Sequence, residues 1–237
     1  MQAIIMAGGK GKRLREVISD IPKPLAQING KPLLDYIIEH AKNNGCDNII
    51  ITTGYLGEKI KEHIEKNNYG IAIQISQEDK PLGTAGSLLP IKDLLEEEFF
   101  VLYGDVFTTI NLSTMFKFHK QKHSDATLAL HTSDHPQDST IVKVNKNKKI
   151  SKLVEKPGNN WKKYGNLTAT SIYILKKDIL NLIANDGEED LTKDLFPKLL
   201  KKDKNLFGYI TNEYAKDIGT PERYQKVQEY VKINYQI

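Results

Sequence analysis

The chain has 237 residues, of which 39% are hydrophobic and 27% charged, so it can bury a sizeable core and is not expected to be disordered. Its formal net charge is only +4 and its lysines are spread along the chain, which argues against nucleic acid as a partner. No segment is long and apolar enough for a membrane span, no signal peptide is evident, and a single cysteine, Cys46, suits a reducing cytoplasm.

The first half of the chain alternates apolar runs of strand length with segments of helical periodicity. Strands are predicted over residues 3–6, 49–51, 71–75 and 99–103, and helices over 33–42, 57–66 and 84–95. Continuous apolar strands separated by helices are typical of a parallel sheet covered on both faces. We therefore expect an α/β fold whose ligands bind at the carboxyl ends of the strands.

The second half is richer in strands. Closely spaced strands are predicted over 127–131, 141–144, 150–154 and 168–175, followed by helices over 177–184, 191–200 and 221–233. Because no Pro- or Ser-rich linker and no repeat interrupts the sequence, we expect a single domain over 1–237. Its parts are a parallel-sheet part over about 1–125, a β-rich excursion over about 126–176 and a C-terminal part over about 177–237.

A glycine-rich loop follows the first predicted strand, with the sequence Ala-Gly-Gly-Lys-Gly-Lys-Arg over residues 7–13. Its glycines let backbone amides approach an anion, and Lys10, Lys12 and Arg13 add full positive charges. The loop is not a Walker A motif, since no Gly-Lys-Ser/Thr follows at the required spacing, nor is it a good dinucleotide fingerprint. The pattern indicates a binding site for a polyphosphate.

Three further side chains stand at informative places. Lys23 lies between two prolines, which stiffen the backbone and keep it out of a helix. Asp105 follows the buried strand 99–103, so its carboxylate should lie at the mouth of a site. Asp217 lies just before the last helix, whose start is marked by Thr-Pro. One or two carboxylates are what Mg²⁺ usually takes from a protein.

These motifs resemble the signature of the sugar-1-phosphate nucleotidyltransferase family. The glycine loop with its arginine is followed about ten residues later by Pro-Lys-Pro, Leu-Gly-Thr-Ala-Gly over 82–86 resembles the family's nucleobase segment, and Glu-Lys-Pro over 155–157 matches its sugar-phosphate motif. The resemblance covers nearly the whole chain, and the compact length is similar to that of heptose- and mannose-1-phosphate guanylyltransferases. It implies a Rossmann-like, mostly parallel sheet of the GT-A type, flanked by helices, with a β-rich sugar-binding excursion.

The resemblance also implies roles for individual residues. Catalytic roles fall to Arg13, Lys23 and Asp105, and a Mg²⁺ ion would be held by Asp105 and Asp217. Nucleotide contacts would come from Ala7, Gly8, Gly9, Gly11, Arg13, Glu78, Gly83 and Thr84. Sugar-phosphate contacts would come from Gly104, Glu155, Lys156 and Ser171. The implied partners are a nucleoside triphosphate and a sugar 1-phosphate, in the supply of nucleotide sugars for surface polysaccharide. A homo-oligomer is one option for the assembly.

Glu78 favours GTP as the triphosphate. Guanine offers adjacent N1–H and N2–H donors that one carboxylate can accept together, whereas uracil and thymine offer only N3–H. Three alternatives stay open: a uridylyl-, cytidylyl- or thymidylyltransferase of another sugar phosphate, a glycosyltransferase that uses a nucleotide sugar, and a non-catalytic sensor. A glycosyltransferase would carry Asp-x-Asp at the strand end, where this chain has Gly104-Asp105-Val106.

Overall fold

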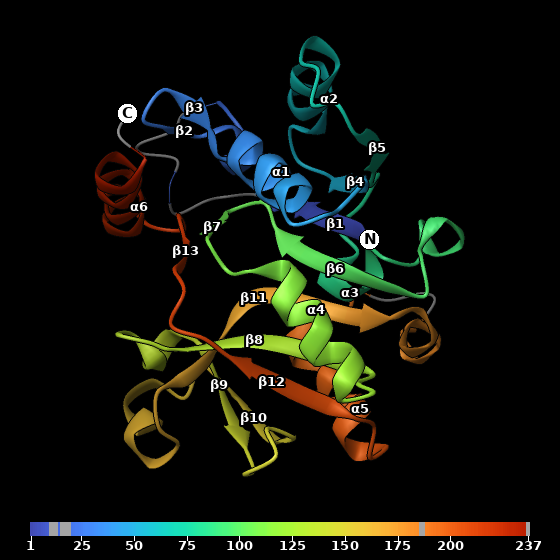
Figure 1. Cartoon of the computed structure of the whole chain (residues 1–237), viewed down its shortest axis with the longest axis vertical. Helices are drawn as coiled ribbons and strands as arrows, with labels where there is room; N and C mark the ends of the chain where they lie inside the picture. Colours follow the sequence, from blue (N-terminus) through green and yellow to red (C-terminus); the bar gives the residue numbers. More distant parts are fainter. Residues whose placement is uncertain (10–13, 15–19, 185–187, 236–237) are drawn as a thin grey trace. The chain divides into compact units, whose positions relative to one another are not determined.

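The computed structural model describes residues 1–9, 14, 20–184 and 188–235, and the chain forms two compact units that are interleaved in sequence. Unit 1 comprises Met1–Pro81, Leu102–Thr109 and Tyr214–Ile237. Unit 2 comprises Leu82–Val101 and Ile110–Glu213. Strand β6 (Glu98–Tyr103) carries the chain from unit 2 back into unit 1 (Figure 1).

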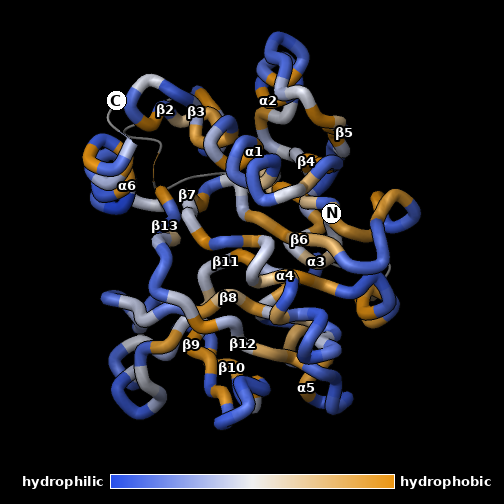
Figure 2. The backbone as a smooth tube through the Cα atoms, in the orientation of Figure 1, coloured by the Kyte–Doolittle hydropathy of each residue, from blue (hydrophilic) through white to orange (hydrophobic). Residues whose placement is uncertain are grey.

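Unit 1 is built on a parallel sheet. Strands β1 (Gln2–Ala7), β4 (Asn48–Thr53) and β5 (Ala72–Gln77) pair in that order, with Ile4 opposite Ile50. All of β1 and most of β4 are buried, which explains why both read as continuous apolar runs, and β6 is coloured mostly as hydrophobic in Figure 2. The parallel sheet confirms the α/β expectation.

Helices α1 (Leu33–Asn43), α2 (Gly57–Lys66) and α6 (Pro221–Asn234) belong to the same unit. The apolar face predicted for α1 is the face that it buries: Leu33, Leu34, Ile37, Ile38 and Ala41. Helix α6 starts where the sequence predicts, because Thr220 caps it and proline occupies its first position. Among the described residues, no helix is both long and apolar enough to cross a membrane.

Three short elements complete unit 1. The 3-10 turn η2 (Lys23–Leu25) precedes a hairpin of β2 (Gln27–Ile28) and β3 (Lys31–Pro32). The expectation that Lys23 stays out of a helix is wrong for this single turn, since proline is tolerated in a first helical turn. Strands β7 (Val106–Thr108) and β13 (Ala215–Asp217) pair antiparallel, which joins two segments more than a hundred residues apart.

Unit 2 contains the β-rich excursion. Strand β8 (Ala126–Thr132) pairs antiparallel with β11 (Leu167–Lys176) and parallel with β12 (Leu206–Ile210). Strand β9 (Thr140–Val144) pairs antiparallel with β10 (Ile150–Glu155) and with β11. The pairing of β8 with β11 shifts between Ala169 and Tyr173, so β11 bulges around Ser171.

The helical parts of unit 2 differ most from expectation. They are α3 (Gly83–Gly86), η3 (Lys92–Leu94), α4 (Leu112–Gln121), η4 (Pro136–Asp138), η5 (Gly158–Lys163), η6 (Lys177–Leu182), η7 (Leu191–Leu195) and α5 (Phe196–Lys201). A helix over 84–95 is wrong, because Pro90 lacks the amide that a continuing helix needs. The helix predicted over 177–184 is a 3-10 helix, and the one over 191–200 begins as a π-helical turn.

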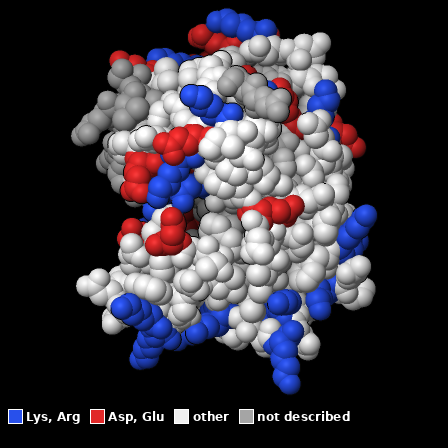
Figure 3. Space-filling view, turned by 60° about the vertical axis from the view of Figure 1, so that its left-hand side comes forward, with Lys and Arg blue, Asp and Glu red and all other residues white. Residues whose placement is uncertain are grey.

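Basic side chains are scattered over the face in Figure 3 and form no continuous patch there.

Candidate active site

The carboxyl ends of the parallel strands in unit 1 bring Gly8, Gly54 and Glu78 together. A Cβ added at Gly8 would lie 3.7 Å from the Gly54 nitrogen and 3.8 Å from Oε2 of Glu78. The Glu78 amide donates to the Thr53 carbonyl at 2.8 Å, which fixes the residue just after β5. Two residues predicted to contact the nucleotide therefore lie at one edge of one sheet.

The rest of the predicted phosphate loop is described only in part. Ala7 is buried at the end of β1, and Gly9 is exposed, with no atom of the described residues within 4 Å of an added Cβ. Gly11 and Arg13 lie outside the described residues, as do Lys10 and Lys12. The roles expected of these four residues stay predictions.

Asp105 forms an ion pair with Lys23. The Lys23 Nζ donates to Oδ2 of Asp105 at 2.9 Å, and the two side chains are 14% and 28% exposed. Gly104 sets this geometry, because its amide donates to the Met6 carbonyl at 2.9 Å and an added Cβ would lie 3.0 Å from both that oxygen and Cγ of Pro24. The strand end that carries Asp105 is thus packed tightly against the turn that carries Lys23.

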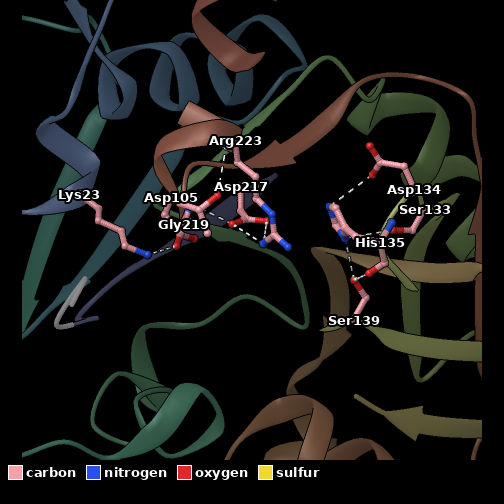
Figure 4. A network of polar contacts seen from close by, with 10 residues as sticks. Lys23, Asp105, Ser133, Asp134, His135, Ser139, Asp217, Gly219 and Arg223 are labelled. Atoms are coloured by element: carbon pink, nitrogen blue, oxygen red, sulfur yellow. Dashed lines mark hydrogen bonds and ion pairs between the residues drawn. The ribbon is translucent and has the colours of Figure 1, made fainter. Parts of the chain in front are cut away.

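Asp217 forms a second ion pair, with Arg223. Nη1 of Arg223 lies 3.1 Å from Oδ1 and 2.9 Å from Oδ2 of Asp217, and the Gly219 amide donates to Oδ1 at 2.8 Å (Figure 4). Sequence reasoning gave Arg223 no role. Its position in the first turn of a helix, where a cation is unfavourable, was the signal that could have found it.

Backbone pairing places the two aspartates on adjacent segments. Asp217 stands opposite Val106 across β7 and β13, and the Ile218 amide donates to the Asp105 carbonyl at 2.8 Å. Figure 4 shows the Asp105 and Asp217 side chains next to each other in unit 1. Two neighbouring carboxylates are a donor set that suits Mg²⁺, and in this structure each is paired with a basic side chain. Among the described residues no group of three or more His, Cys, Asp or Glu could hold a metal ion, so a site with many protein ligands is not formed there.

In unit 2, the predicted nucleobase segment is held by residues 189–191. Gly83 has φ +74°, and an added Cβ would lie 2.3 Å from the Glu189 carbonyl oxygen. The Thr84 hydroxyl donates to Oδ1 of Asp190 at 3.0 Å and accepts from the Leu191 amide at 2.9 Å. Gly83 and Thr84 therefore have a structural role in shaping this segment, whatever they contribute to binding.

Charges link this segment to Glu155 within unit 2. Asp190 pairs with Lys193 at 3.2 Å. Burial acts to raise the pKa of Asp190, but hydrogen bonds from Thr84 and Lys193 outweigh it and leave that pKa below its ordinary value. The pairing with Asp190 raises the pKa of Lys193, and Glu155 adds to this shift. The sequence gave no role to Asp190 or Lys193.

Two residues predicted to contact the sugar phosphate have strained backbones. Lys156 has φ +39° and Ser171 has φ +62°, both in the left-handed region that non-glycine residues avoid. The Ser171 side chain hydrogen-bonds that of Tyr173, and the Lys156 amide donates to the Ser139 carbonyl at 3.1 Å. Such strain gathers at functional sites.

The Ser139 contact connects Lys156 to a polar loop around His135. Nδ1 of His135 lies 3.2 Å from Oγ of Ser133 and 3.3 Å from Oγ of Ser139, and Nε2 lies 3.4 Å from Asp134 (Figure 4). The ring is therefore held by its own loop.

Comparison with known proteins gives consistent matches over the full length. The family described as "Nucleotidyl transferase" matches residues 2–233. A D-glycero-alpha-D-manno-heptose 1-phosphate guanylyltransferase from Campylobacter jejuni is 37% identical over 94% of this chain and 97% of its own length. The protein of the same name from Aneurinibacillus thermoaerophilus is 33% identical over 97% of both chains. The crystal structure of HddC from Yersinia pseudotuberculosis complexed with GMP-PN has a TM-score of 0.84 and 28% identity, covering 98% of this chain and 99% of that one.

Proposed function

Because the chain belongs to the nucleotidyl transferase family, we propose that it transfers GMP from GTP to a sugar 1-phosphate and releases pyrophosphate. Heptose 1-phosphate is the first candidate acceptor and mannose 1-phosphate the second. Two relatives named as heptose 1-phosphate guanylyltransferases and the HddC structure with GMP-PN support this choice. The product would be a GDP-sugar for surface polysaccharide, made in the cytoplasm.

The proposed reaction is an in-line displacement. An oxygen of the sugar 1-phosphate, already ionised at neutral pH, attacks the α-phosphorus of GTP. The new oxygen–phosphorus bond forms as the bond from the α-phosphorus to the oxygen that bridges to the β-phosphorus breaks, and pyrophosphate leaves with that electron pair. Since no proton has to be removed, the protein's task is to position the two substrates and to neutralise charge.

The main support for the proposal is the position of Asp105 and Asp217 on adjacent segments. Asp105 and Asp217, on segments joined by β7 and β13, would hold one Mg²⁺ ion, which supplies charge neutralisation at the phosphates. Lys23, which reaches Asp105 at 2.9 Å, would then donate to the phosphoryl group that is transferred. Arg13 would bind the triphosphate with the backbone of the glycine loop.

Glu78 would recognise guanine at the edge of the parallel sheet by accepting hydrogen bonds from its N1–H and N2–H groups. Its carboxylate lies close to Gly8, which leaves the space of a missing side chain at the end of β1. In unit 2, Lys156 would bind the sugar phosphate, and Glu155 and Ser171 would bind sugar hydroxyls. The strained φ angles at Lys156 and Ser171 support a functional reason for these residues.

The proposal is tested by a panel of GTP, ATP, UTP, CTP and dTTP against heptose 1-phosphate and mannose 1-phosphate. Pyrophosphate release is measured, and the product is identified by ³¹P NMR. We expect turnover with GTP and one of the two sugars, and a different preferred triphosphate would overturn the base assignment. Release of pyrophosphate with none of the pairs would exclude these two acceptors, and turnover of a preformed GDP-sugar instead would refute the transferase reaction.

Variants assign the residues. Asp105→Asn and Lys23→Met are expected to lower kcat about 100-fold or more, because the first removes a carboxylate that would hold Mg²⁺ and the second removes a positive charge beside the reacting phosphates. Asp203→Asn and Lys66→Met change the same residue types at side chains that are 94% and 75% exposed, and they should keep wild-type rates. Near-normal rates for both site variants would remove these residues from the mechanism.

A further inference from the structure

Arg223 occupies a helix position that ordinarily favours an acid. Its amide donates to the Thr220 hydroxyl at 3.3 Å, which makes Thr220 the N-cap and Arg223 the third residue of the first turn of α6. Glu or Gln is preferred at this position, and the positive end of the helix dipole disfavours a cation there. The stability of the helix does not explain an arginine at residue 223, so its contact outside the helix must.

That contact uses both oxygens of Asp217. The guanidinium reaches Oδ1 and Oδ2 at 3.1 and 2.9 Å, and the Gly219 amide adds a second donor to Oδ1 at 2.8 Å. The Arg223 side chain is only 14% exposed, so water weakens this attraction less than it would at an open surface. Both carboxylate oxygens that a divalent cation could use are therefore already in contact with one nitrogen of the protein's own cation (Figure 4).

Resting on the metal role proposed above for Asp217, we propose that Arg223 is an internal counterion that competes with the divalent cation for this carboxylate. A cation binds Asp217 only when the guanidinium has moved off it, so the nucleotide-free enzyme binds the cation weakly. A triphosphate supplies further oxygen ligands for the cation and negative charge for the released guanidinium. The divalent cation and the nucleotide therefore bind together, and Arg223 acts as a positioning residue.

The other aspartate has a weaker competitor. Lys23 contacts Oδ2 of Asp105 through a single ammonium group, whereas Arg223 contacts both oxygens of Asp217. A guanidinium is also less strongly hydrated than an ammonium, so it loses less hydration when it pairs with a carboxylate. The control over metal binding is therefore assigned to Arg223.

The test is Mn²⁺ binding to the full-length, nucleotide-free protein, measured by electron paramagnetic resonance. Arg223→Met removes the competing charge and should bind Mn²⁺ about tenfold more tightly or better, whereas Arg223→Lys keeps a weaker competing cation and should bind Mn²⁺ with an affinity between those of the methionine variant and the wild type. Lys226→Met is the matched control, because Lys226 lies on the same helix and pairs with Glu222 at 2.7 Å. It should leave Mn²⁺ affinity unchanged.

Unchanged or weaker Mn²⁺ binding by a folded Arg223→Met protein would overturn the proposal, since a purely structural arginine predicts that result. Arg223→Gln provides the same test if the methionine variant does not fold. Asp217→Asn separates the two levels of inference. If it binds Mn²⁺ like the wild type when a non-hydrolysable GTP analogue is present, the metal assignment itself fails, and if it loses Mn²⁺ under that condition while nucleotide-free Arg223→Met gains nothing, only the counterion role fails.

Discussion

Replacing Gly104 by alanine should move the turn that carries Lys23 away from the strand end that carries Asp105. The added Cβ would lie 3.0 Å from the Met6 carbonyl oxygen and 3.0 Å from Cγ of Pro24, whereas carbon contacts are most favourable at about 3.5–4.0 Å. The β1 backbone is buried and paired on its β4 side, so the turn that carries Pro24 and Lys23 should yield, by roughly 0.5–1 Å. Overpacking of this size costs about 1–3 kcal/mol of unfolding free energy.

A shift of that size at Lys23 matters more for rate than for folding, because misplacement by about 1 Å can cost on the order of 100-fold in rate. Urea unfolding measures the change in stability, and kcat for pyrophosphate release measures the change in rate, both on the same purified protein. Gly8→Ala is the control for stability, since among the described residues its Cβ would meet nothing closer than 3.7 Å, and it should change the unfolding free energy by no more than about 0.5 kcal/mol. Wild-type stability and kcat in Gly104→Ala would refute the packing argument.

Three further variants test other parts of the molecule. Ser171→Gly relieves a φ of +62°, worth about 1 kcal/mol, but removes the hydrogen bond to the buried Tyr173 side chain, worth about 1–3 kcal/mol, so it should lower the free energy of unfolding by up to about 2 kcal/mol and raise KM for the sugar 1-phosphate; a stabilised variant would contradict this balance. Glu78→Gln should raise KM for GTP about tenfold and leave KM for the sugar unchanged; an unchanged GTP preference would remove Glu78 from base recognition. Burial lowers the pKa of His119 to about 4, so between about pH 6.5 and 4 the unfolded chain binds a proton that the folded chain does not. The free energy of unfolding of the wild type should therefore fall by up to roughly 3 kcal/mol as the pH falls through that window. Urea titrations should show a smaller fall in the free energy of unfolding for His119→Gln. An equal fall in the two proteins would contradict this reasoning.

The sequence predicted the parallel strands and the helices of unit 1 well. Their apolar runs and periodicity are local signals, and the buried faces of β1 and α1 are the ones that the pattern indicates. The family assignment is confirmed by the family match. It could be made from the sequence because its motifs are short, ordered and tied to strand ends. Helix prediction failed over 84–95, where Pro90 outweighs the apolar spacing.

The contacts that build the site could not be read in the same way. The pairing of β7 with β13 joins two strands of three residues each, too short for a periodic signal and more than a hundred residues apart. Without that pairing, only the family resemblance relates Asp105 to Asp217. The ion pairs with Lys23 and Arg223 depend on the same non-local contact.

The central claim is that one divalent ion is shared by Asp105 and Asp217 beside the triphosphate. Anomalous diffraction from crystals grown with Mn²⁺ and a non-hydrolysable GTP analogue tests it most directly. The account predicts one manganese peak at a ligand distance of roughly 2.0–2.3 Å from carboxylate oxygens of both aspartates and near the phosphates. A peak that contacts only one of the two carboxylates, or lies away from both, would contradict it.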